Sequence, residues 1–143
     1  MAIFNQLADI PITGGGTVTC KNYGGTDIPA GTGVLLDTTN VQGSNAAPGV
    51  VVPTSGGGVV GTFGIAMETI PAGKNGRVMY AGGYPMIADG AITAGVFVQI
   101  SDTAAKMGRA KVCGAALIQL GQALTTAADG DPVLVLIDKA RNS

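Results

Sequence analysis

The sequence predicts an all-β fold, either a sandwich or a barrel, and three observations support this class. The chain has 143 residues with 24 glycines and 7 prolines, so few stretches remain long enough for a helix. Short runs rich in Val and Ile recur between Gly, Pro and Asn, a pattern typical of strands separated by turns. The runs "GRVMY" at 76–80 and "GRAKV" at 108–112 alternate polar and apolar residues, as half-buried strands do.

The expected strands follow one another between turn residues along most of the chain. The first run, at 31–39, comes after Pro29, and the second, at 49–54, is interrupted by Pro53. The remaining strands are expected at 58–70, 76–83, 95–102, 108–117 and 131–138.

Helical patterns are weak by comparison. Residues 4–10 allow a turn or two before Pro11, and residues 115–129 have a helical spacing of apolar residues that Gly121 interrupts. We therefore expect at most one short helix.

Length and composition predict one domain with an appended segment. Residues 1–26 are apolar at first and then rich in Gly and Thr, with "TGGGT" at 13–17 as a flexible joint. They are expected to form an N-terminal arm or edge segment, and residues 27–143 a single β domain. Within this domain the Gly, Ser, Asn and Pro content of residues 40–58 predicts a long exposed loop around one short strand.

A weak internal repeat is visible in the chain. "IPAGTGVLLDTT" at 28–39 resembles "ITAGVFVQISDT" at 92–103, and "GIAMETIPAG" at 64–73 is echoed by "GAALIQLGQAL" from residue 114. Two copies of a strand–turn unit can pair their apolar faces into one closed core.

Charge and composition argue against several classes of function. A net charge of −1 provides no basic field for nucleic acid or anionic lipid. The chain has no His, the side chain best suited to proton transfer near neutral pH and the commonest metal ligand. Its longest aliphatic run is far shorter than the roughly 20 residues that span a bilayer, and its N-terminus lacks the pattern of a signal peptide. We therefore expect synthesis in a cytosol, with no nucleic-acid or membrane partner.

The segment "ETIPAGKNGRVMYAGGY" at 68–84 is the strongest candidate for a phosphate-binding loop. However, Gly73 and Lys74 are followed by Asn75 instead of Ser or Thr, and the residues after them have the pattern of a strand. A phosphate loop depends on the helix N-terminus that follows it. The segment is therefore interpreted as a turn, with Pro71 fixing φ and Asn75-Gly76 tolerating left-handed conformations.

The remaining reactive side chains are scattered. Asp129 and Asp131 could chelate a cation, but no calcium-loop spacing surrounds them, and a solvated turn is the simpler interpretation. Cys20 and Cys113 match no metal or redox spacing, so free thiols are expected, with a disulfide between them as the alternative. No catalytic residue, metal site or cofactor is expected.

Over roughly residues 59–138, the order and spacing of turns and strands resemble those of the capsid decoration, or cement, proteins of tailed bacteriophages. The matching features are "GIA" at 64–66, "AGKNGRV" at 72–78, "DGAITAGVFV" at 89–98 and the closing "DGDPVLVLI" at 129–137. The first 55 or so residues match less well. The resemblance implies a compact β-barrel-like or β-tulip domain, a homotrimer, and a place on the outer surface of the capsid, bound to the major capsid protein and stabilising the head.

The resemblance also implies that an N-terminal arm reaches onto neighbouring subunits. In this chain that role would fall on the apolar residues Ile3, Phe4, Leu7 and Ile10. The low share of charged residues, 12% against roughly 25% in ordinary proteins, suits a surface covered by partners.

Two other classes of function stay open. A carbohydrate- or surface-binding module of a phage fibre or adhesin would need exposed aromatic residues, yet Phe63, Phe97 and Tyr80 lie in strand patterns and are expected in the core. An accessory domain of an enzyme would need a partner chain that supplies the missing base, together with a clustered acidic site.

Overall fold

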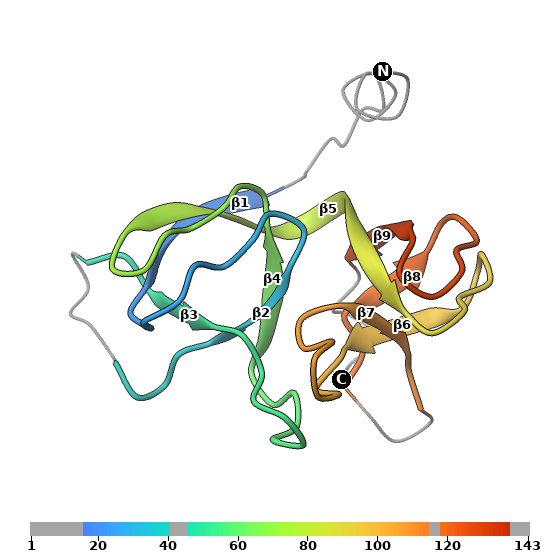
Figure 1. The fold of residues 1–143 in the computed structure, drawn as a ribbon. Coiled ribbons are helices and arrows are strands. Elements are labelled where there is room, and N and C mark those ends of the chain that lie inside the picture. Colours follow the sequence, from blue (N-terminus) through green and yellow to red (C-terminus); the bar gives the residue numbers. More distant parts are fainter. Residues whose placement is uncertain (1–15, 41–45, 115–117, 138–143) are drawn as a thin grey trace.

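The protein is described by a computed structural model, which covers residues 16–40, 46–114 and 118–137. These residues form β-strands and contain no helix (Figure 1). The strands are β1 (Gly16–Asn22), β2 (Gly33–Leu36), β3 (Gly49–Val51), β4 (Thr62–Ala66), β5 (Asn75–Asp89), β6 (Phe97–Ile100), β7 (Ala110–Val112), β8 (Gly121–Ala123) and β9 (Pro132–Ile137). The all-β prediction is confirmed, and the possible helical turns at 4–10 lie outside the described residues.

Strand β5 is 15 residues long and belongs to two closed rings of strands. In the first barrel the order is β1-β3-β2-β4-β5, closed by the antiparallel pairing of β1 with β5. In the second barrel the order is β5-β7-β6-β8-β9, closed by the antiparallel pairing of β5 with β9. The barrels lie side by side, the first in blue to green and the second in yellow to red (Figure 1). The predicted barrel-like architecture is therefore present twice.

The second barrel repeats the strand pairings of the first. In each, the first strand pairs parallel to the third, as β1 with β3 and β5 with β7, and the other pairings are antiparallel. Isolated bridges join Ile28 to Ile70 and Ile92 to Ala127 at equivalent places. The repeat of residues 28–39 at 92–103 thus corresponds to a structural repeat.

The second sequence match is out of register. Residues 64–73 correspond to residues 121–130, not to the segment that starts at residue 114. Gly64 lies against the carbonyl of Met79, and Gly121 against that of Leu136, at equivalent points of the two barrels. The Gly-rich composition of both segments concealed this shift of register.

Two strands were not expected from the sequence. Strand β8 falls inside the helical pattern at 115–129, where the close approach of Gly121 to β9 decides in favour of a strand. Strand β1 falls inside the predicted arm, and its Cys20 and Asn22 side chains are buried in the first barrel. Any arm therefore ends before Gly16. Strand β3 is the short strand expected within the loop at 40–58.

The hydrophobic core joins the two barrels. A smaller cluster fills the first barrel; its buried members are Cys20, Ile28, Val34, Val50, Ala66, Ile70 and Val78. A larger cluster fills the second barrel and continues into the first through Leu35, Ile65 and Met79. Hydrogen bonds reinforce this junction, with Gly33 N donating to Gly108 O at 2.7 Å and Tyr84 Oη to Met67 O at 2.8 Å. The two barrels are packed as one body.

Candidate functional site

The described residues contain no cluster suited to metal binding or redox chemistry. Within them, no group of three or more Cys, Asp and Glu is placed to hold a metal ion. Cys20 and Cys113 are not joined by a disulfide. Burial raises the pKa of the Cys20 thiol to about 11 and also raises the pKa of the Cys113 thiol. A thiol is a weak nucleophile unless it ionises, so neither cysteine has the character of a reactive residue. Among the same residues, no helix is long and apolar enough to cross a membrane.

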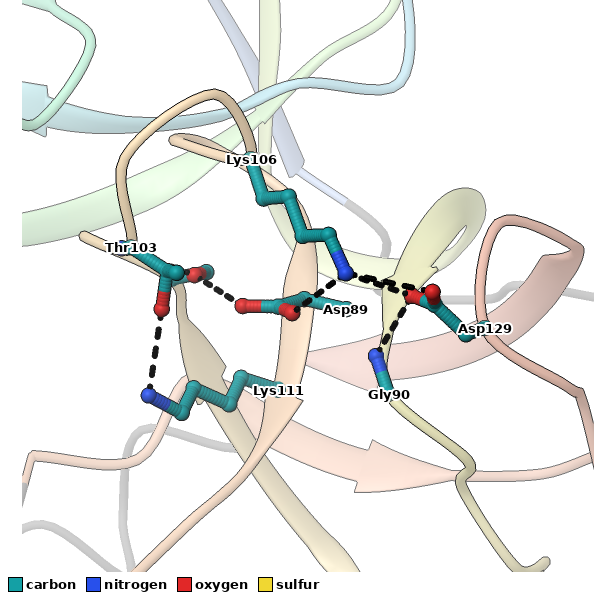
Figure 2. Close-up of polar contacts among 7 residues, drawn as sticks. Asp89, Gly90, Thr103, Lys106, Lys111 and Asp129 are labelled. Carbon is teal, nitrogen blue, oxygen red and sulfur yellow. Dashed lines mark hydrogen bonds and ion pairs between the residues drawn. The ribbon is translucent and has the colours of Figure 1, made fainter.

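The densest polar cluster lies at one end of the second barrel, where three turns meet (Figure 2). Lys106, between β6 and β7, reaches Asp129 between β8 and β9 at 3.1 Å and Asp89 at the end of β5 at 3.6 Å. Asp89 also accepts a hydrogen bond from the Ser101 hydroxyl, and Asp129 accepts one from Gly90 N at 2.9 Å. Two carboxylates that are 40 residues apart in the chain are thus joined by one ammonium group.

The electrostatics of this cluster favour the charged forms. Burial raises the pKa of Asp89, but hydrogen bonds from Ser101 and Thr103 and the charges of Lys106 and Lys111 outweigh it, and the pKa is lowered. The Gly90 hydrogen bond, followed by contact with Lys106, lowers the pKa of Asp129. The hydrogen bond to Asp129 raises the pKa of Lys106 in spite of some desolvation. Such a cluster clamps three turns together, and its charges satisfy one another.

The structure also decides the interpretation of residues 68–84. Lys74 N donates to Pro71 O at 3.0 Å and Gly73 N donates to Asn22 O at 2.7 Å, so the segment is a turn that leads directly into β5. The left-handed residue is Gly73, with φ of 75°, and Asn75 already belongs to the strand. The turn prediction is confirmed, and its left-handed position moves from Asn75-Gly76 to Gly73.

The prediction that Tyr80 lies in the core is wrong. Its side chain is 44% exposed, whereas Phe63 and Phe97 are half-buried. Thr17 pairs with Met79 and Gly16 with Ala81, so Tyr80 is the extra residue of a β-bulge, and its ring lies over Gly16. Bulges shift the inward and outward alternation of a strand, and the pattern "GRVMY" gave no sign of one.

The predicted binding residues Ile3, Phe4, Leu7 and Ile10 lie outside the described residues. Sequence reasoning missed a second set of candidates, the outward-facing apolar residues of the second barrel. Ile87, Leu124 and Leu136 are 39%, 44% and 38% exposed. The run "PVLVLI" at 132–137 has the pattern of a fully buried strand, because an all-aliphatic run does not show which of its side chains face outward.

These features define an all-β double barrel whose titratable cluster serves to join turns and whose exposed residues include several large apolar side chains. Comparison with protein families gives the class a name. A model of the phage cement protein family matches residues 12–137, which is most of the chain. The chain therefore belongs to the phage cement protein family, and it is a bacteriophage structural protein.

A solved structure extends the comparison. The fold is similar to that of the head fiber gp8.5 N base of bacteriophage phi29, with a TM-score of 0.60 and 16% sequence identity. The similarity covers 87% of this chain and 95% of that one. At this identity the likeness concerns the fold alone. The curated proteins contain no match to the sequence.

Proposed function

We propose that this protein decorates the outside of an icosahedral phage head, where it binds the major capsid lattice as a homotrimer and stabilises it. The observation that carries the proposal is the match of the cement protein family over residues 12–137. The fold it shares with a head fiber base is in keeping with a position on the head. We propose a purely structural role, without catalysis, because the clustered carboxylates Asp89 and Asp129 are already paired with Lys106.

Residues 1–15 are the candidate arm within this proposal. They carry the apolar side chains Ile3, Phe4, Leu7 and Ile10 ahead of the glycines at 14–16. The described chain starts at Gly16, which pairs with Ala81 near the middle of β5, where one barrel passes into the other. A segment joined at this point can order on a neighbouring subunit without any change in either barrel.

Binding to heads that lack this protein tests the function. The purified protein is mixed with such heads, free protein is removed by sedimentation, and the bound fraction is imaged by electron microscopy. We expect regular density on the outer surface and heads that withstand a higher temperature before they release DNA. Heads that bind no protein, or that bind it without gaining stability, would refute the proposed function.

Two variants examine the arm separately. Deletion of residues 2–12 is expected to weaken binding to heads while the melting temperature of the free protein stays unchanged. The matched variant replaces Ile3, Phe4, Leu7 and Ile10 with Ser and keeps the length of the chain. Equal losses from both variants would assign the binding to the apolar side chains, and full binding by both would remove the arm from the proposal.

A second candidate function, a surface- or carbohydrate-binding module of a phage fibre, is favoured by one observation. Tyr80 is exposed, and an exposed aromatic ring can stack on a sugar. Binding to a panel of bacterial surface glycans, compared between the wild-type protein and Tyr80→Ala, tests this function. Binding that Tyr80→Ala abolishes would favour the fibre module over the cement role.

A further inference from the structure

One face of the second barrel is apolar although it points outward. Along β9 the side chains alternate: Val133, Val135 and Ile137 are buried, whereas Pro132 and Leu136 are exposed and Leu134 is half-buried. In most surface strands those outward positions are polar. Here they are Pro132, Leu134 and Leu136.

The strands on both sides of β9 extend this apolar surface. On β5, Pro85 is paired with Leu134 and Ile87 with Pro132. Paired residues of neighbouring strands project to the same side of a sheet. At the end of β8, Leu124 N donates to Leu134 O at 2.8 Å. We call this surface the apolar face; it consists of Pro85, Ile87, Leu124, Pro132, Leu134 and Leu136.

A hollow adjoins the apolar face where the two barrels meet. It is lined by Pro85, Ile87 and Pro132 of the face, by Ala30 and Gly31 of the first barrel, and by Tyr84 and Met86 of β5. Its volume is about 210 Å³. A hollow of this kind can accept an apolar side chain from a partner.

The first barrel supplies an internal control for this surface. Because the pairings of β1 with β5 and of β5 with β9 are equivalent, each position of the apolar face has a counterpart in the first barrel. Ile87 corresponds to Lys21, and Pro85 to Thr19. Pro132 corresponds to Asn75, and Leu134 to Arg77. The fold therefore accepts polar and charged residues at these four positions, so its stability does not require apolar side chains there. Leu124 and Leu136 correspond to Met67 and Met79, which are apolar and pack in the shared core.

We infer that the apolar face is the surface through which copies of this chain associate with one another. The inference rests on the homotrimer in the proposed function and adds the surface that holds it together. Around a symmetry axis each residue near the axis meets its own copy, so a charge there would meet a like charge. The six residues of the apolar face carry no charge. The equivalent surface of the first barrel carries Lys21 and the ion pair of Arg77 with Glu68 at 3.7 Å, and charged side chains are depleted at the centres of interfaces between identical subunits.

The composition of the face also favours a permanent partner. Obligate interfaces between identical subunits have apolar centres with few charged residues, whereas interfaces that form and dissociate are more polar. The six residues have neither a charge nor a hydroxyl, as expected at the centre of an obligate interface, and Gln122, paired with Leu136, borders them. The surrounding polar residues would form its rim.

The test uses a substitution that the repeat itself provides. Leu134→Arg places the residue of the equivalent position, Arg77, in the apolar face. The control Thr17→Arg adds the same charge at an exposed position of β1 in the first barrel. The oligomeric state of each full-length protein is measured by sedimentation velocity over a range of concentrations, and folding by circular dichroism. We expect an oligomeric wild type, an unchanged control, and association weakened roughly 100-fold or more in Leu134→Arg.

Ile87→Lys, which copies Lys21, is the second variant and covers the case in which Leu134→Arg fails to fold. A monomeric wild-type protein would overturn the inference, and so would folded face variants that associate as tightly as the wild type. If the face variants stay oligomeric but no longer bind heads, the face belongs to the capsid contact, and self-association through this face is refuted. If they become monomeric while the wild-type oligomer does not bind heads, the inference holds and the proposed function fails.

Discussion

The two barrels have the same strand order and pairing but achieve similar contacts with different side chains. In the first barrel, Asp27 accepts a hydrogen bond from the backbone N of Ala72 at 3.1 Å. In the second, the residue equivalent to Ala72 is Asp129, and it accepts a hydrogen bond from the backbone N of Gly90 at 2.9 Å. A carboxylate therefore joins the same two segments in both barrels. In the first barrel the earlier segment supplies it, as Asp27, and in the second barrel the later segment does, as Asp129. The topology requires a contact between the two segments but does not determine which of them supplies the side chain.

A second difference lies at the start of each barrel. Asn22 is buried, and its amide donates to Thr26 O at 2.7 Å and Ile70 O at 3.0 Å while its oxygen accepts from Gly24 N at 2.9 Å. Its counterpart Ala88 makes the same two backbone hydrogen bonds to the turn before the last strand but has no side chain to anchor a loop. The loop after Ala88 is two residues shorter, so it needs no anchor.

These differences separate what the fold requires from what it allows. Positions at which both barrels keep the same contact, such as Gly64 with Gly121 and Asp37 with Ser101, serve the fold. The last two both accept a hydrogen bond from the backbone N of a Thr two residues later. Positions that change from charged to apolar, such as Arg77 with Leu134, are available for function. The predictions below test this distinction.

The largest effect is expected at the shared glycines. In both Gly64→Ala and Gly121→Ala the new methyl group would collide with a backbone carbonyl of the neighbouring strand, that of Met79 or of Leu136. Gly→Ala also restricts the unfolded chain, which stabilises by only about 0.4–1 kcal/mol. We expect each variant to lose about 3 kcal/mol or more of unfolding free energy, measured by chemical denaturation.

Gly25→Ala is the matched control for both variants. Gly25 is exposed, and a methyl group there would meet nothing within 4 Å. We expect a change within about 0.5 kcal/mol. A large loss at one shared glycine without the other would show that the two barrels are less equivalent than their pairings indicate.

Asn22→Ala is expected to cost about 2–3 kcal/mol, because it removes three hydrogen bonds and leaves Gly24 N without its acceptor. The exposed Asn75 provides the control, Asn75→Ala, for which a change within about 0.5 kcal/mol is expected. Denaturation curves give both values. Equal losses in the two variants would mean that the loop after β1 does not depend on its anchor.

Gln99→Leu should stabilise the protein, by about 1 kcal/mol. Gln99 is 5% exposed, and its side-chain oxygen has no hydrogen-bond partner within the described part of the chain. The equivalent residue of the first barrel is Leu35, a member of the shared core. The reverse change, Leu35→Gln, should destabilise. A loss of stability in Gln99→Leu would show that the amide has a role that its hydrogen bonds do not reveal.

The sequence predicts the fold class because turn residues and short aliphatic runs alternate along the chain. It also reveals half of the repeat, where "IPAG" and "ITAG" mark the same turn. The closing of two rings through one long β5 is not predictable in this way, because β5 has turn-like glycines at its centre, Gly82 and Gly83. Pairing with β9 at both residues, and not local propensity, keeps that segment within the strand, although Gly82 has a φ of 113°.

The sequence likewise predicts some features of the candidate sites and not others. The absence of His excludes the commonest kind of general base from the sequence alone. The meeting of Asp89 and Asp129 on Lys106 depends on three turns that only the folded barrel brings together. The apolar face depends on the register of β9, which fixes the side on which Leu134 and Leu136 project. Neither arrangement leaves a local pattern in the chain.

The smallest effect is expected at the ion-pair cluster, which has no counterpart among the described residues of the first barrel. In Lys106→Gln the stability should fall slightly at neutral pH, and the loss should shrink with added salt, since Lys106 is partly exposed. Lys74→Gln, which removes an exposed lysine from the turn between β4 and β5 in the first barrel, is the control. Thermal melts of both variants against pH measure the difference.

The pH dependence identifies the cause of the loss in Lys106→Gln. The pKa values of Asp89 and Asp129 are lowered from 3.8, so their contribution is present above pH 3.8 and disappears as the pH falls through the lower folded-state values. The pKa of Lys106 is raised from 10.5, so its contribution is complete below pH 10.5 and disappears as the pH rises through the higher folded-state value. The difference between wild type and Lys106→Gln should therefore persist between these limits and vanish in acid. A difference that survived protonation of both carboxylates would mean that Lys106 acts through the packing of its aliphatic chain, and the second barrel would then have no electrostatic clamp that the first lacks.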